Sequence, residues 1–388
     1  MVNLPVTDND NLKRLNSIFE SGKVTLSYKF YWLLAIIDEL EQRQKANKSL
    51  TDEMLLTDLA INMLSLALYP TVYFKLNFGF NDKLSQGVQD LVTLLKLPIT
   101  ISPDDFKQQV KAALKQKEVQ NEVSKIVNAL LVYVPERFLS PWYIKSPTLK
   151  FKSRATAATY QEFFSNALNN QGPYLLYKSD QNSYLKLNQD FLSYFCTYSS
   201  IIKSYAYYHL TLFLEKRNQG VPNIAQKLIK DTERSSLKAQ KELFNSYFKL
   251  HGNKMESIYS RVVLTPNDYA IDHFIPWSFM LNDLIYNLAP IDTTTNSQKS
   301  NLLPPHDLIE KLAELHFDIL QNVKSGELFK TGELSSLNQD FIREYSNLGQ
   351  GQFKKVLAYS ELEFVKALDS TLSPLLQIAS NNGFAPWK

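Results

Sequence analysis

Apolar residues recur every three or four positions along most of the chain, a spacing typical of α-helices with one buried face. The run from Tyr28 to Gln44 shows it clearly, with apolar side chains on one face and charged ones near its end. Residues 103–132 continue the pattern after Ser102, which can cap the first turn. Further helices are predicted over residues 188–217, 222–250, 306–317 and a last apolar segment that ends near residue 379.

Two regions depart from the helical pattern. Residues 173–187 alternate around a polar Ser-Asp-Gln-Asn turn, which predicts a β-hairpin. Beyond residue 251, the run that ends at His273 and residues 285–289 predict two short strands, and residues 293–299 predict a helix that Thr294 or Thr295 caps. The fold class is therefore mainly α, in three parts. These are a large helical N-terminal region (1–250), a small ββα unit (251–320) and a helical C-terminal cap (321–388).

The composition agrees with a folded protein of more than one domain. The chain has 388 residues, 44% hydrophobic and 21% charged, and a single core usually stops growing at roughly 250–300 residues. Its one cysteine, Cys196, excludes an internal disulfide and a cysteine-cluster zinc site. Since the first residues also lack the pattern of a secretory signal, we expect a cytoplasmic location. The most apolar run, residues 59–74, is too short for a membrane span, so no membrane partner is expected.

The residues best suited to chemistry lie within residues 269–304. Asp272 and His273 end the first predicted strand, where their side chains would point to opposite faces. A ββα unit lets a strand-end carboxylate and the helix amide of Asn296 converge on one cation, and oxygen ligands suit magnesium. A neutral histidine beside that ion could take a proton from water, and Lys299, one turn from Asn296, could hold a phosphate. These parts suffice to hydrolyse a phosphodiester bond.

The order of these residues resembles the HNH (ββα-metal) nuclease motif. The stretch DHFIPWSF, with NLAP, a helix Asn, KSN and LP after it, is similar to the HNH domain of CRISPR effector nucleases and to bacterial defence and restriction HNH proteins. The resemblance implies that Asp272 and Asn296 bind Mg²⁺ or Mn²⁺ and that His273 is the general base. It also implies that Asn287 orients the histidine, that Lys299 is the helix lysine, and that cleavage leaves 5′-phosphate ends.

One position departs from the motif. Some relatives carry an acid two residues before the helix asparagine, and Thr294 stands there in this chain. Either a ligand is missing at this position or water fills it. The resemblance is strong over residues 269–304 and weak over the rest of the chain.

A basic segment before the motif is the predicted DNA contact. Its basic residues recur every three or four positions and would share one helical stripe that neutralises phosphates. The stripe consists of Lys227, Lys230, Arg234, Lys238 and Lys241. Because the net charge is only +3, a polyanion must be met by such a local patch. A second basic stretch, residues 137–154, is an alternative, and each stretch could instead be a solvated face.

The sequence thus predicts a cytoplasmic, metal-dependent HNH endonuclease that hydrolyses DNA in phage defence or restriction. The helical N-terminal region would recognise or gate the substrate, or bind a protein partner of a defence system. Two alternatives stay open. One is an RNA-cleaving effector on the same scaffold, and the other is a non-catalytic helical adaptor with a degenerate nuclease unit.

Overall fold

The computed structural model divides the chain into two compact units. The N-terminal unit comprises residues 1–219 with 227–229, and the C-terminal unit comprises residues 220–226 with 230–388. The structure describes residues 4–5, 7–19, 25–46, 51–143, 172–229, 236–266, 268–334 and 340–388. Among the described helices, none combines the length and the apolar character that a membrane crossing requires.

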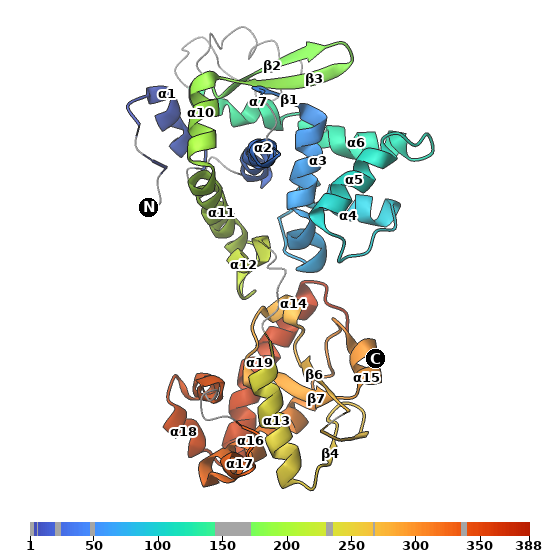
Figure 1. Ribbon diagram of the computed structural model, residues 1–388, viewed down its shortest axis with the longest axis vertical. Coiled ribbons are helices and arrows are strands. Elements are labelled where there is room, and N and C mark those ends of the chain that lie inside the picture. Colours follow the sequence, from blue (N-terminus) through green and yellow to red (C-terminus); the bar gives the residue numbers. More distant parts are fainter. Residues whose placement is uncertain are drawn as a thin grey trace. The chain divides into compact units, whose positions relative to one another are not determined.

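The N-terminal unit is built from helices and one small sheet (Figure 1). Its first elements are α1 (Asp10–Lys13), η1 (Arg14–Ser17), α2 (Tyr28–Lys45), β1 (Glu53–Leu55), α3 (Leu56–Leu66) and the π-helical turn η2 (Tyr69–Tyr73). Then follow α4 (Lys83–Leu94), α5 (Pro103–Ala113), α6 (Gln120–Leu131), α7 (Val134–Phe138) and α8 (Ser140–Tyr143). After them come β2 (Tyr174–Ser179), β3 (Asn182–Leu187), α10 (Gln189–Thr197) and α11 (Ser199–Glu215). The residues of helix α12 (Ile224–Leu228) are divided between the two units.

Helix α2 is the centre of the N-terminal unit. Its residues from Phe30 to Ile37 are all buried, and it contacts α3, α7, α10 and α11. A helix that is apolar on nearly every side must be surrounded by other elements. The indole of Trp32 donates a hydrogen bond to the hydroxyl of Tyr174 at 2.8 Å, which ties α2 to the sheet.

The sheet of this unit has the strand order β1-β3-β2, with both pairs antiparallel. The hairpin β2–β3 pairs Tyr174 with Leu187 at its open end and Ser179 with Asn182 at its turn. Asp180 has a positive φ of 54° in that turn, a conformation that aspartate adopts more readily than most residues. The predicted hairpin over residues 173–187 is therefore present.

The C-terminal unit contains the segment in which the chemistry was predicted. Its elements begin with α13 (Lys238–Leu250), β4 (Met255–Glu256), β5 (Val263–Leu264), β6 (Ala270–His273), α14 (Trp277–Met280), η3 (Ile285–Asn287), β7 (Leu288–Ile291) and α15 (Thr293–Lys299). They continue with α16 (Leu308–Ser325), α17 (Glu327–Lys330), η5 (Asp340–Gly349), α18 (Phe353–Leu357) and α19 (Glu361–Asn381). β4 pairs with β5 and β6 pairs with β7, each antiparallel.

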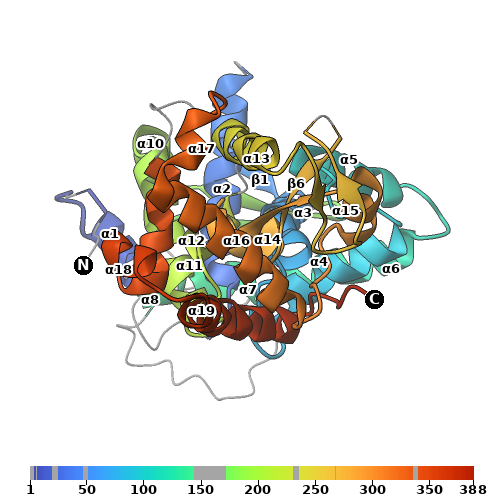
Figure 2. The same cartoon turned by 90° about the horizontal axis from the view of Figure 1, so that it is seen from below.

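One hydrophobic core joins the strands of the C-terminal unit to its helices. Helices α16 and α19 lie side by side over it, as Figure 2 shows. His316 of α16 is fully buried: its Nε2 donates to the carbonyl of Leu288 at 2.9 Å, and its Nδ1 accepts from the Tyr345 hydroxyl. Burial lowers the pKa of His316 to about 4, so this ring is neutral. Backbone bonds link Leu303 with Ala385 and Trp387 as well.

The predicted class, mainly α, is confirmed, but several details differ. The predicted helix 103–132 is two helices, α5 and α6, because residues 114–119 leave the helical conformation. Residues 53–55 add a strand, β1, to the predicted hairpin by pairing with β3. The second predicted strand begins three residues late, at Leu288, because Ile285–Asn287 form a 3₁₀ turn.

The boundaries of the two units also differ from the predicted ones. The sequence pattern placed α13 in the helical region that ends at residue 250, whereas Leu243, Phe244 and Phe248 of α13 lie in the core of the C-terminal unit. Residues of α16 and α19 belong to that same core. The segment predicted as a ββα unit and the predicted cap therefore share one hydrophobic interior.

Candidate active site

The candidate site lies where β6 ends. Asp272 and His273 are its last two residues, and they pair with Ala289 and Leu288 of β7. Because successive side chains of a strand point to opposite faces, the two residues have different surroundings. Asp272 is buried and His273 is partly buried. Pro276 then leads into the short helix α14.

His273 is held by a carboxylate on the loop that follows α14. Its Nε2 lies 2.8 Å from Oδ1 of Asp283. A carboxylate can only accept a hydrogen bond, so Nε2 carries the proton and Nδ1 of a neutral ring keeps its lone pair. The pair is mostly shielded, with 11% of the histidine side chain and 21% of the aspartate side chain exposed. This arrangement leaves one defined nitrogen to act as a base.

Asp272 makes a buried ion pair with Lys299 of α15. Nζ of Lys299 lies 2.8 Å from Oδ2 of Asp272, and the same oxygen accepts a 2.8 Å hydrogen bond from the Tyr259 hydroxyl. Nζ also donates to the carbonyl of His273 at 2.8 Å and lies 5.7 Å from the centre of the Tyr259 ring. Lys299 thus links the end of β6 to helix α15.

The burial of Lys299 contradicts its predicted contact with a phosphate. Its side chain is 0% exposed, so its ammonium group cannot reach a phosphate without leaving Asp272. Burial lowers the pKa of Lys299, and the charge of Asp272 and its hydrogen bond act against that shift. The lysine is a structural partner of the metal-ligand candidate in this structure.

Asn287 reaches the backbone that follows His273 and not the imidazole itself. Its side chain accepts a hydrogen bond from N–H of Ile275 at 2.9 Å and donates to the carbonyl of the same residue at 3.0 Å. Its own carbonyl accepts from N–H of Phe274 at 2.7 Å. Asn287 is fully buried. It therefore fixes the course of the chain directly after the histidine.

Helix α15 carries Asn296 and Lys299 on one face. Its N-cap is Asp292, whose Oδ1 accepts from N–H of Thr295 at 2.8 Å, so the predicted caps Thr294 and Thr295 are wrong. Capping and a contact with Ser260 lower the pKa of Asp292, while its burial has the opposite effect. Residues three apart on a helix are neighbours. Because Lys299 reaches Asp272, Asn296 lies one turn from that contact, and it is half-buried.

These donors fit a hard divalent ion that keeps much of its water. Asp272 offers a carboxylate whose Oδ1 makes no hydrogen bond to the described residues, and Asn296 offers an amide oxygen. Magnesium commonly binds one or two protein oxygens together with water and substrate phosphate. Within the described ranges, no three His, Cys, Asp or Glu side chains gather as a closed metal cluster. The donor set therefore suits an ion held jointly with substrate.

The structure contradicts the predicted single stripe of basic residues. Lys227 is fully buried in α12, and burial lowers its pKa to about 7. α12 ends at Leu228 and α13 begins at Lys238, so the stripe does not follow one described helix. Lys230 and Arg234 lie outside the described residues, as does most of the alternative stretch 137–154. Lys238 and Lys241 are exposed in the first turn of α13.

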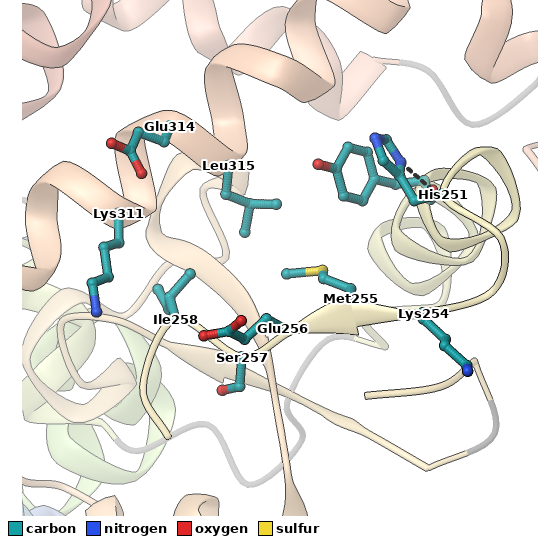
Figure 3. Close-up of a pocket in the computed structure, with 10 residues that line it drawn as sticks. His251, Lys254, Met255, Glu256, Ser257, Ile258, Lys311, Glu314 and Leu315 are labelled. Carbon is teal, nitrogen blue, oxygen red and sulfur yellow. Dashed lines mark hydrogen bonds between the residues drawn. The ribbon is translucent and has the colours of Figure 1, made fainter. Parts of the chain in front are cut away.

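A pocket of about 500 Å³ opens elsewhere in the C-terminal unit. Met255 and Glu256 of β4 face Lys311 and Glu314 of α16 across it (Figure 3). Lysine and glutamate side chains occur together in its lining, so the pocket has no dominant charge. None of the predicted site residues lines it.

The comparison with known families agrees with this location. Residues 256–305 match the family described as HNH endonuclease. No curated protein and no solved structure matches the chain. The matched segment runs from β4 past α15 and contains the five predicted residues of the site. This segment is therefore similar to HNH endonucleases, and the similarity suggests nuclease activity and nucleic-acid binding.

Two residues of the site were not predicted. Asp283 accepts a hydrogen bond from His273, and Tyr259 donates one to Asp272. Neither has a spacing that marks it, because both reach the site across loops.

Proposed function

We propose that this chain is a metal-dependent HNH endonuclease that hydrolyses phosphodiester bonds in DNA. The observation that carries the proposal is the imidazole of His273, which Asp283 holds through Nε2 and which follows the buried residue Asp272 at the end of β6. Within a segment similar to HNH endonucleases, that geometry supplies a base with a defined free nitrogen.

In this reaction Nδ1 of His273 accepts the proton of the attacking water. Asp283 keeps the ring oriented and stabilises the imidazolium that forms. Asn287 fixes the backbone after the histidine, so the ring starts from a rigid position. The side chains of Asp272 and Asn296 would hold Mg²⁺ or Mn²⁺, which supplies polarisation of the phosphate and stabilisation of the leaving 3′ oxygen.

A cleavage assay with matched variants tests this function. The purified chain is incubated with plasmid DNA and with RNA, in Mg²⁺, in Mn²⁺ and in EDTA. We expect metal-dependent cleavage of DNA, and a loss of about 10²-fold or more in His273→Ala because the base is removed. His306→Ala is the control, since His306 is an exposed histidine that bonds Ser373.

Each other outcome points to a different conclusion. Cleavage of RNA alone would replace the DNA proposal with the RNA-cleaving effector. A chain that is inert on both substrates with either ion would be the non-catalytic adaptor. Equal activity of His273→Ala and the wild type would refute the assignment of the base. Ligation of the products without kinase treatment would test for 5′-phosphate ends.

The exposed lysines of α13 are our proposed DNA contact, with Lys230 and Arg234 as further candidates. Charge reversal at both Lys238 and Lys241 should weaken DNA binding and lower the slope of log affinity against log salt by about two, because each lost phosphate contact removes about one. Lys366→Glu, at an exposed position of α19, is the control. An unchanged slope would show that these lysines of α13 form a solvated face and do not contact DNA.

The biological setting is a proposal that rests on the sequence resemblance. We propose a role in phage defence or restriction, in the cytoplasm and with a protein partner of a defence system. Cells that express the wild type should form fewer plaques on phage challenge than cells that express His273→Ala. Equal plaque numbers over a range of phages would contradict the role.

A further inference from the structure

A second cavity, in the N-terminal unit, has a buried acid in its wall. Its volume is about 810 Å³, and it lies between the hairpin β2–β3, strand β1 and helices α6 and α7. Six of its thirteen lining residues are aliphatic. Its apolar residues are Leu56, Leu131, Val132, Leu139, Leu175 and Leu176.

Glu136 of α7 is the unusual member of this wall. The residue is 3% exposed, and its Oε2 is buried with no hydrogen-bond partner among the described residues. A buried carboxylate oxygen without a donor is costly, so such a group is normally paired. Burial raises the pKa of Glu136 to about 7, and a hydrogen bond to its own backbone opposes that shift.

The other charged groups of the cavity stand on its exposed rim. Lys178 and Lys186 are exposed on β2 and β3, and Glu53 is exposed on β1. Nζ of Lys186 is 3.3 Å from Oε1 of Glu53 and 3.9 Å from Oδ2 of Asp52. In the described part of the chain, none of these lysines forms an ion pair with Glu136. Lys186 therefore has its acidic partners on the rim, and the acid in the wall has no basic partner among the described residues.

The position of Glu136 is fixed by the residues around it. The hydroxyl of Tyr174 donates to the carbonyl of Pro135 at 2.6 Å and accepts from the indole of Trp32 at 2.8 Å. The ring of Phe138 stacks on Tyr174 with 6.0 Å between centres. Helix α7 is therefore tied to α2 and β2 on both sides of Glu136. The carboxylate is a preorganised acceptor, and a ligand that uses it avoids the cost of ordering it.

We propose that this cavity binds a cationic organic molecule, whose ammonium or amidinium group donates to Oε2 of Glu136 while an apolar body lies against the leucine wall. A cation supplies both the missing hydrogen-bond donor and the missing charge, which a neutral donor does not. The volume suits a small organic ligand. This site is separate from the nuclease proposal, since all its residues belong to the N-terminal unit.

Binding of small probes to the full chain tests the site. The probes are benzamidine, phenethylamine and tyramine, with benzamide as the neutral counterpart of benzamidine, and binding is measured by saturation-transfer NMR and calorimetry. We expect millimolar affinity for the cations, because probes of this size seldom bind more tightly. Glu136→Gln should lose about tenfold or more of this affinity. Glu53→Gln should keep it, because that acid stands on the rim.

A second variant shows whether a loss of binding in Glu136→Gln results from the site itself or from misfolding. Leu131→Trp keeps Glu136 but fills the cavity, and it should also abolish binding, with circular dichroism as the check that both variants are folded. If none of the cations binds, the proposal is overturned. Equal affinity in Glu136→Gln would also overturn it. Binding of benzamide as strong as that of benzamidine would show that the cavity selects a neutral ligand, contrary to the proposal.

Discussion

Removal of the amine of Lys299 should destabilise the C-terminal unit strongly. Lys299→Met preserves most of the buried stem but leaves Asp272, whose side chain is 8% exposed, with the Tyr259 hydroxyl as its remaining partner. The loss of one partner from a buried ion pair typically costs about 3–5 kcal/mol. Whole domains are stable by only about 5–15 kcal/mol, so the variant should be close to its unfolding threshold.

Three further variants separate the parts of this effect. Tyr259→Phe removes one hydrogen bond to the carboxylate and should cost about 1–3 kcal/mol. Asp272→Asn leaves a buried lysine unpaired and should cost several kcal/mol, whereas the double variant with Lys299→Met leaves no buried charge. The double variant should therefore be more stable than the sum of the two single changes predicts, by about 1–3 kcal/mol.

The measurement must report on the C-terminal unit alone, because a chain of two units need not unfold in one step. Hydrogen exchange of peptides that cover β6 and β7, followed over a urea series, gives the free energy of opening of those strands. Lys366→Met at an exposed position should change it by less than about 0.5 kcal/mol. A value for Lys299→Met within about 1 kcal/mol of wild type would show that the ion pair does not hold the site together.

Other consequences concern single side chains. Glu136→Gln should stabilise the N-terminal unit by about 1–3 kcal/mol at about pH 8 and hardly at about pH 4. The reason is that the carboxyl group has a pKa near 4.5 in the unfolded chain and of about 7 in the folded one, so its buried charge costs free energy only at the higher pH. Urea unfolding at both pH values measures the effect, and an equal effect at the two would contradict this reasoning. Asn287→Ala leaves both backbone groups of Ile275 unpaired and should lower the free energy of opening of β7 by about 2–4 kcal/mol, as measured by hydrogen exchange. No change in this free energy would show that solvent replaces the amide. Asp283→Asn should slow cleavage at least about tenfold and change stability by less than about 1 kcal/mol, so an unaltered rate would exclude Asp283 as the residue that positions His273.

Local signals in the sequence account for much of the fold. The helical period predicted α2 nearly to both ends and the C-terminal end of α19, and the turn residues predicted the hairpin β2–β3. Ser102 caps α5 as expected, because its hydroxyl accepts from N–H of Asp105. These features depend on residues within a few positions of one another, so a single chain is enough to predict them.

Long-range contacts set the limits of that prediction. The spacing of Lys227 fits a helical stripe, but spacing does not say which face a neighbouring element covers, and this lysine is buried. Asp283 and Tyr259 reach their partners across loops, which no periodicity marks. Lys299 was expected to meet a phosphate because it follows Asn296 by one turn. The structure shows that the same geometry also brings it to Asp272.

The stretch that resembles known nucleases is not a module that could be cut out and moved. His316 of α16 donates a hydrogen bond to the carbonyl of Leu288, and the N–H of Trp387 donates one to the carbonyl of Leu303. An isolated fragment of residues 256–305 would lose these hydrogen bonds and expose the buried apolar side chains of β7 to solvent. Transfer of this segment to another scaffold should therefore include the helices that follow it.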